Sequence, residues 1–355
     1  MRRLFPTLLF PAVLAGLSSC LPTAARSEDY SMRNVVGQAG ARETPQLRER
    51  LTGMIVTVKP VGGIIAIDLP GLQTRELRSS GGAHTAVHGI SEPDAAGRVV
   101  FVDGGGTAGR HFNVQWSAGG AEKLLFTGKG DPLWDHAISP LSLSPTGERI
   151  AYVVQQPGNE GRQYQPLVKG PLHVWDSSAG VSRDLSITST DERPSWFPDG
   201  QRLAYVSPAS ASDNSPTEPS VHIVDTRNSS DTVLAPGHLP LVSTDGKTVL
   251  LMRGKTFEIV LVDVATRRET MVPRVHGFGT AVALFDSRYL VYKGKPTPGE
   301  PTGTTTNNSP LVGEKPMLAV KVLDLKTGEF ATLIPLIDPR SAVTARGHAT
   351  VPNAK

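Results

Sequence analysis

The only cysteine of the chain, Cys20, carries its clearest chemistry. A cysteine thiolate is a strong nucleophile near neutral pH, which suits thioether attachment of a lipid. Arg2 and Arg3 precede it, followed by an apolar and uncharged stretch over 4–17. This order is the layout of a secretory signal, and the stretch is shorter than the roughly 20 residues that a spanning helix needs. We expect a cleaved signal peptide over 1–19.

The residues around the cleavage point sharpen this prediction. The run Leu17-Ser18-Ser19-Cys20 resembles the bacterial lipobox. The resemblance implies that Cys20 is lipidated, so that acyl chains hold the protein at a membrane without a spanning helix. Leu21 rather than Asp follows, which by resemblance to Gram-negative lipoproteins favours the outer membrane, facing the periplasm or the cell surface. Two alternatives are an ordinary signal peptide with an incidental cysteine and a twin-arginine signal, of which Arg2-Arg3-Leu4-Phe5 matches a part.

A second set of side chains is suited to binding a protein or a glycan. These basic, aromatic and polar residues lie in segments without a strand pattern, where binding residues are common: Arg110, His111, Asp135, His136, Arg162, Tyr164 and Gln165. The adjacent pair Asp135 and His136 also suits a catalytic dyad, although such a pair is more often part of a turn. Neutral spacers explain the same segments equally well.

The sequence holds no motif of a known catalytic type: no Gly-x-Ser-x-Gly, no His-Glu-x-x-His, no phosphate-binding loop and no paired-cysteine zinc pattern. We therefore expect no cofactor and no bound metal. Removal of 1–19 takes away two of the 36 Lys and Arg and none of the 33 Asp and Glu. The remaining chain is nearly neutral and has no basic stripe, so nucleic acid is not an expected partner. We expect a monomer with a packed core and no intrachain disulfide.

The elements that would position these residues follow from an internal repeat. A turn with Pro, Asp or Gly, then a basic or polar residue, then an apolar strand recurs five times, over 93–101, 144–153, 197–206, 243–251 and, in degenerate form, 285–292. The first four copies share a glycine, at Gly97, Gly147, Gly200 and Gly246. Glycine accepts positive φ, so the chain can reverse tightly into the next strand.

A second phrase follows after a variable gap and consists of an alternating strand, an aspartate, a short turn and another strand. The aspartates are Asp68, Asp176, Asp225, Asp263 and Asp324, and 112–116 stands in the same place without one. We expect each aspartate to accept backbone N–H bonds within its turn. A metal role is the alternative, which their wide separation along the chain disfavours.

Four strands in each of six units predict an all-β fold, a six-bladed β-propeller, because one blade alone cannot bury both faces. The expected blades are 54–78, 86–127, 137–187, 193–235, 239–273 and 279–335. The run from Pro194 to Tyr205, PSWFPDGQRLAY, closely resembles the signature of TolB-like (WD40-like) propeller repeats, and the similarity spans 54–335. The α/β domain that precedes the propeller in TolB has no counterpart in this sequence, so the resemblance implies the fold and not the role of TolB.

The first expected blade lacks an obvious innermost strand. The tail over 341–355 contains an extended stretch, 342–345, which we expect to return to this blade and close the ring. The predicted order is thus a signal peptide over 1–19, a lipidated Cys20 with a flexible tether over 20–50, and a propeller over 51–340. A short helix is expected within 44–51.

Long insertions at 104–110, 155–170, 207–219 and 294–315 fall between strands two and three of their blades, on the face that also holds the blade-to-blade connections. We therefore expect a non-enzymatic binding or scaffold lipoprotein that presents this face to an envelope protein or polysaccharide. The alternative is an exported polysaccharide lyase or glycan hydrolase with a site in the central channel. Histidines from several blades hold a metal in some propeller lyases, so the candidate ligands are His84, His88, His111, His136 and His276. His173 and His222 occupy matching repeat positions, which indicates blade packing with an imidazole hydrogen bond.

Overall fold

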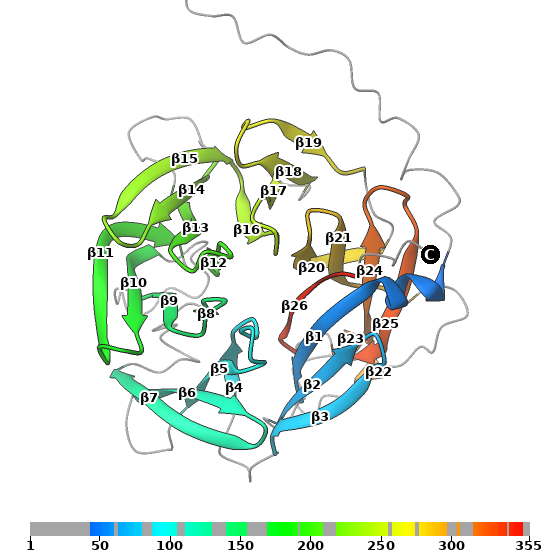
Figure 1. Cartoon of the computed structure of the whole chain (residues 1–355), viewed down its shortest axis with the longest axis horizontal. Helices are drawn as coiled ribbons and strands as arrows, with labels where there is room; N and C mark the ends of the chain where they lie inside the picture. Colours follow the sequence, from blue (N-terminus) through cyan, green and yellow to red (C-terminus); the bar gives the residue numbers. More distant parts are fainter. Residues whose placement is uncertain are drawn as a thin grey trace, which may run out of the picture. The chain divides into compact units, whose positions relative to one another are not determined.

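The short apolar runs between turn residues form antiparallel strands that make a ring of six sheets (Figure 1). The computed structural model describes residues 43–59, 63–79, 87–104, 111–129, 140–154, 169–190, 192–208, 218–254, 258–273, 277–296, 304–305, 315–338 and 341–350. Cys20 and the other predictions for 1–42 lie outside these residues. The ring is the predicted six-bladed β-propeller, and each predicted unit corresponds to one four-stranded sheet.

Each of the first three blades has four strands, named in order from the innermost to the outermost. Blade one is β26 (Val343–Ala349), β1 (Leu51–Val58), β2 (Ile64–Leu69) and β3 (Gln73–Arg78); blade two is β4 (Val87–Ile90), β5 (Val99–Gly104), β6 (His111–Ala118) and β7 (Ala121–Lys129); blade three is β8 (Ser142–Leu143), β9 (Arg149–Val153), β10 (Lys169–Asp176) and β11 (Val181–Thr190).

The other three blades have the same order. Blade four is β12 (Ser195–Trp196), β13 (Arg202–Ser207), β14 (Ser220–Asp225) and β15 (Ser230–Pro236); blade five is β16 (His238–Val242), β17 (Thr248–Arg253), β18 (Glu258–Asp263) and β19 (Glu269–Met271); blade six is β20 (Phe278–Phe285), β21 (Tyr289–Gly294), β24 (Leu318–Asp324) and β25 (Phe330–Ile337). Within blade six, β22 (Thr304–Thr305) and β23 (Lys315–Pro316) pair as a small separate ladder.

The turns follow from the repeat as predicted. The four repeat glycines all have positive φ, between 63° and 75°. The degenerate copy has no glycine and instead places Asp286 and Ser287 at φ of 48° and 56°. A short polar side chain tolerates this region better than other L-residues do, because it can hydrogen-bond locally. The same reversal into strand two is therefore made in blade six without glycine.

Four of the five repeat aspartates cap their turns as expected. The Oδ1 atoms of Asp176, Asp225, Asp263 and Asp324 accept backbone N–H bonds of 2.7 to 3.2 Å from residues two or three positions further on. Asp68 differs, because its carboxylate instead accepts a bond from Arg75 Nε at 3.3 Å. In these four blades, the aspartate carboxylates are therefore hydrogen-bonded within their own turns, all at one face of the ring.

The core is divided into six apolar clusters, and each lies between two neighbouring blades. Trp196 of blade four, for example, packs with Val153 of blade three, and its indole Nε1 donates to the Ser142 carbonyl oxygen at 2.9 Å. The sixth cluster joins blade six to blade one through Phe285 and Ile55. The blades stabilise one another in a closed circle, so the loss of one interface opens the ring.

The C-terminal strand supplies the innermost strand that the first blade lacks. β26 pairs antiparallel with β1, with seven residues of each strand in register. Gly53 and Gly347 face each other in this ladder, where a Cβ on Gly347 would lie 2.3 Å from the Thr52 carbonyl oxygen. Two facing glycines therefore allow β1 and β26 to approach closely.

The residues just before β1 pack on the propeller. Pro45–Arg50 form a short 3-10 helix, η1, at the place where a helix is expected, and Leu47 is fully buried between blades one and six. Thr44 N donates to the Phe330 carbonyl oxygen at 2.8 Å. Residues 43–50, included in the expected tether, are therefore part of the folded unit. Within the described residues, no helix has the length and apolar character needed to cross a membrane.

Candidate functional site

The binding residues predicted from the sequence lie almost entirely outside the described part of the chain. Arg110, Asp135, His136, Arg162, Tyr164 and Gln165 fall in its gaps, as do His84 and His276. His111 begins β6 and His88 lies in β4, but only their backbone positions are described. The prediction that these side chains form a site therefore concerns side chains outside the described part of the chain.

The strands that flank the four insertions show on which face of the ring each insertion begins. The insertions connect β5 to β6, β9 to β10, β13 to β14 and β21 to β24, which are strands two and three of their blades. Strands alternate in direction, so these ends share a face with the connections between blades. We call this the insertion face, and the opposite one, which holds the capped hairpins, the hairpin face.

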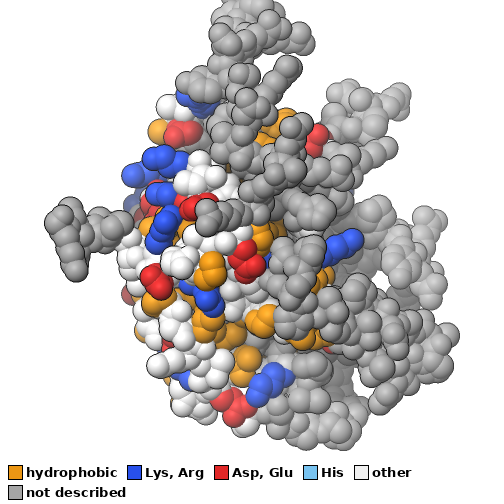
Figure 2. All heavy atoms as spheres, turned by 90° about the vertical axis from the view of Figure 1, so that its right-hand side faces the viewer, with side chains coloured by type: hydrophobic (Ala, Val, Ile, Leu, Met, Phe, Trp, Pro, Cys, Tyr) orange, Lys and Arg blue, Asp and Glu red, His pale blue; other side chains and the backbone are white. Residues whose placement is uncertain are grey.

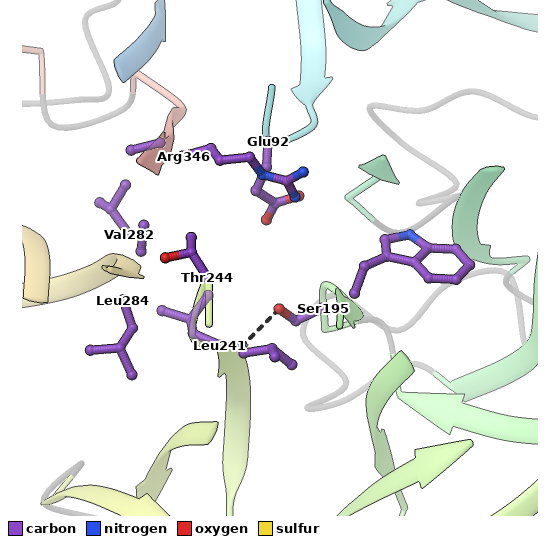
Figure 3. Close-up of a pocket in the computed structure, with 11 residues that line it drawn as sticks. Glu92, Ser195, Leu241, Thr244, Val282, Leu284 and Arg346 are labelled. Carbon is purple, nitrogen blue, oxygen red and sulfur yellow. Dashed lines mark hydrogen bonds between the residues drawn. The ribbon is translucent and has the colours of Figure 1, made fainter. Parts of the chain in front are cut away.

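The innermost strands surround a small cavity on the axis of the ring (Figure 3). The cavity has a volume of about 30 Å³, and five blades contribute to its lining. Its polar lining residues are Glu92 from the segment after β4, Ser195 from β12, Thr244 from the segment after β16 and Arg346 from β26. Figure 3 shows the side chains of Glu92 and Arg346 pointing toward each other across this space.

Glu92 connects three blades through its carboxylate. Arg193 Nη1 donates to Glu92 Oε1 at 3.3 Å, and Ser142 Oγ donates to Oε2 at 3.4 Å. Arg193 is also fixed to blade two, because its Nη2 donates to the Ile90 carbonyl oxygen at 2.8 Å. The side chain of Glu92 is 12% exposed and that of Arg193 is 22% exposed, so water screens this pair only weakly.

Two guanidinium nitrogen atoms among the described residues of the channel are buried without a hydrogen-bond partner: Arg193 Nε and Arg346 Nη1. Burial lowers the pKa of Arg346, because the charged form loses hydration, and the negative charges of Glu92 and Asp94 oppose that shift. Buried polar atoms are nearly always hydrogen-bonded in folded proteins. These two atoms mark the channel as a place where a ligand or water would gain bonds.

More charged groups lie near the insertion-face end of the inner strands. Glu192 Oε1 and His238 Nδ1 are 2.9 Å apart, and Glu192 also accepts a bond from the Leu239 backbone N–H. Lys293 Nζ donates to the Ser341 carbonyl oxygen at 3.2 Å. Burial lowers the pKa of Lys293, an effect that nearby Asp338 partly offsets.

His222 takes the packing role predicted for the matched histidines. Its Nδ1 lies 2.9 Å from Asp231 Oδ2 and its Nε2 2.9 Å from Ser220 Oγ, while its ring packs 5.4 Å from that of Tyr205. His173 packs in the same way on the ring of Tyr152, at 5.6 Å between centroids. Burial lowers its pKa, which favours the neutral imidazole.

The charged network of the channel is what sequence reasoning missed. Glu92, Arg193 and Arg346 are separated by 101 and 153 positions, and no spacing rule connects them. A partial signal was present, because Glu92 and Arg193 each directly precede a proline that lies at or a few residues before the start of a repeat phrase. Among the described residues, no three His, Cys, Asp or Glu side chains are grouped so that they could hold a metal ion.

Comparisons with known proteins bear on the fold alone. No family model matches the chain, and no curated protein matches it. Among solved structures it is similar to TolB from Acinetobacter baumannii, with a TM-score of 0.56 and 14% identity over 84% of this chain. The propeller is TolB-like. The chain covers 66% of that TolB chain, just under two thirds of its length.

Two further structures have comparable similarity to this TolB-like propeller. A putative TolB from Agrobacterium tumefaciens gives a TM-score of 0.52 and 13% identity, with 85% of this chain and 99% of that chain covered. A chain of a nidogen/laminin complex gives a TM-score of 0.52 and 10% identity, with 82% and 98% covered. At such low sequence identities, structural similarity establishes the architecture alone. The function must be argued from the residues of this chain.

Proposed function

We propose that this TolB-like propeller is a lipid-anchored binding or scaffold module of the cell envelope, with a protein or polysaccharide as its partner. The lipobox-like run ending in Cys20 supports the anchor, and the propeller supports the binding role. The observation that carries the binding role is the difference between the two faces of the ring.

On the hairpin face, the turn carboxylates are already bound. The carboxylates of Asp176, Asp225, Asp263 and Asp324 accept N–H bonds of their own turns, so these four acceptors are used within the ring. The insertion face differs, because four inserted segments leave from it and charged side chains such as Glu192 and Lys293 lie near it. Loops held by a rigid scaffold are where proteins place binding residues.

The distribution of charge on the side of the ring favours recognition by particular residues over general electrostatic attraction. On the side shown in Figure 2, basic and acidic side chains of the described residues are interspersed among polar and apolar ones. A mixed surface gives no broad attraction to a highly charged polymer. Recognition by particular residues of the insertion face is the mode that fits this arrangement.

The length of the N-terminal segment suits an anchored propeller. Residues 21–42 separate Cys20 from the first described residue. A chain of this length can span at most about 75 Å when extended, at about 3.4 Å per residue. Because 43–50 pack on blades one and six, the segment would leave the ring at its rim.

The anchor is tested by fractionation of cells that carry the full chain or the Cys20→Ala variant, with the mass of each purified protein measured. The wild-type protein is expected in the membrane fraction with the added mass of its acyl chains, and the variant is expected in the soluble fraction. The same membrane partition for both, with no mass difference beyond the substitution, would reject the anchor. Crosslinking and pull-down from the wild-type cells then identify the partner.

A further inference from the structure

The guanidinium of Arg346 has no counter-ion of its own among the described residues. Arg346 lies in β26, the strand that closes the ring, and its Nη1 is buried without a hydrogen-bond partner. An unsatisfied buried donor destabilises the fold, and more strongly when it belongs to a charged group. A ligand that accepts this bond would therefore recover part of that free energy.

The two carboxylates whose charge acts on Arg346 are both bound elsewhere. Glu92 is held by Arg193 and Ser142. Asp94 accepts bonds from Arg98 Nε at 2.6 Å and from two backbone N–H groups, at 2.8 and 2.9 Å. The Asp94–Arg98 pair is neutral, so Arg193 and Arg346 face the one carboxylate of Glu92. Among the described residues, Glu92, Arg193 and Arg346 together thus carry one excess positive charge.

The cavity beside Arg346 limits what can bind there. A single water molecule needs about 10–15 Å³ of such space, so the cavity of about 30 Å³ holds a group of only a few heavy atoms. Ser195 Oγ accepts the Val242 backbone N–H at 3.0 Å and can donate its own proton. Figure 3 shows Ser195, Thr244 and Arg346 around the same space.

We propose that the channel is a binding site for a small carboxylate, which Arg346 holds. A guanidinium presents parallel N–H donors that match the two oxygen atoms of a carboxylate, and an ion pair of this type is strongest where water is excluded. The size of the cavity admits a carboxylate group such as formate or acetate and excludes a sugar ring. The bound anion balances the excess positive charge, and its binding is independent of the partner of the insertion face.

The test is isothermal titration of sodium formate into the purified full chain at pH 7, with sodium gluconate as the bulky ion that keeps ionic strength constant. Saturable binding is expected for the wild-type protein, with acetate competing. Arg346→Gln should weaken formate binding at least tenfold. Arg253→Gln is the matched control, because it also removes a guanidinium, one that pairs with Glu269 away from the cavity. This control should bind formate as the wild-type protein does.

Three results would overturn the proposal: no saturable heat with the wild-type protein, equal binding by Arg346→Gln, or displacement of formate by an equal concentration of chloride. The last would assign a halide site rather than a carboxylate site. If Arg346→Gln does not fold, Arg346→Lys replaces it. Lysine keeps the charge and loses the paired donors, so formate binding that is unchanged in Arg346→Lys would also contradict the proposal.

Discussion

Removal of 341–355 should cost this protein much of its stability, because that segment contains the strand that closes the ring. The deletion takes away β26 with Val343, Thr344 and Ala345, all buried, and uncovers Ile55 and Phe285, which are fully buried in the same interface. Burying a valine contributes about 2 kcal/mol, and each partly uncovered large side chain forfeits a comparable amount. The Thr344 hydroxyl also donates to the Ser91 carbonyl oxygen at 2.9 Å, which contributes about 1 kcal/mol.

These contributions place the loss at about 7 kcal/mol, against a total stability of about 5–15 kcal/mol for a typical protein. At about 2–4 °C per kcal/mol, the melting temperature should fall by more than about 10 °C. Circular dichroism of the full chain, the 341–355 deletion and a control deletion of 351–355 measures this. An unchanged melting temperature for the 341–355 deletion would refute the closure, and the control should melt like the full chain.

A point variant tests the same closure with the strand retained. Gly347→Ala introduces a Cβ that would lie 2.3 Å from the Thr52 carbonyl oxygen and 2.8 Å from the Phe285 ring. Overpacking of this kind costs about 1–3 kcal/mol. His348→Ala is the control on the next, exposed residue. Equal melting temperatures for the two variants would show that the facing glycines do not determine the approach of β26 to β1.

Three further predictions concern the turns and the blade contacts. Asp225 has a pKa lowered to about 2, chiefly by hydrogen bonds from Arg227. Because this pKa is below the unfolded value of about 3.9, the free energy of unfolding should decrease as pH drops from about 4 toward 2. Over the same pH range, the urea midpoint of Asp225→Asn should fall less steeply than that of the wild-type protein. Asp324→Ala removes a buried carboxylate held by Arg288 at 2.9 and 2.6 Å and should cost about 2 kcal/mol in urea unfolding, and a loss below 0.5 kcal/mol would contradict this account. Trp196→Phe removes the indole bond to blade three and should cost about 1 kcal/mol, while a neutral result would assign that contact to packing alone.

The parts of the fold that could be predicted from the sequence are local or periodic. Gly97, Gly147, Gly200 and Gly246 indicate turns because glycine accepts positive φ without steric cost, and their spacing gives the length of one repeat unit. The extended stretch at 342–345 suggested a ring-closing strand because the first unit lacked one. These inferences need no knowledge of how distant side chains meet.

The channel network could not be predicted in the same way. Arg346 comes near Glu92 only because β26 returns from the end of the sequence to blade one, so their proximity is a property of the closed ring and not of any segment. Of the side chains proposed as binding residues, Tyr164 belongs to an inserted segment and Asp135 to a connection between blades, and both lie outside the described residues. The role proposed for them rests on the face from which those segments leave.

The measurement that tests the proposed function most directly is photo-crosslinking in intact cells from single positions on the two faces. Lys169 and Lys295 are exposed beside insertions, and Lys247 and Lys326 are exposed on hairpin turns. A photoreactive residue at either of the first two positions should give a discrete adduct with an envelope protein or polysaccharide, and one at either of the last two should give none. Adducts of equal yield from both faces, or from the hairpin face alone, would contradict a binding module that acts through its insertion face.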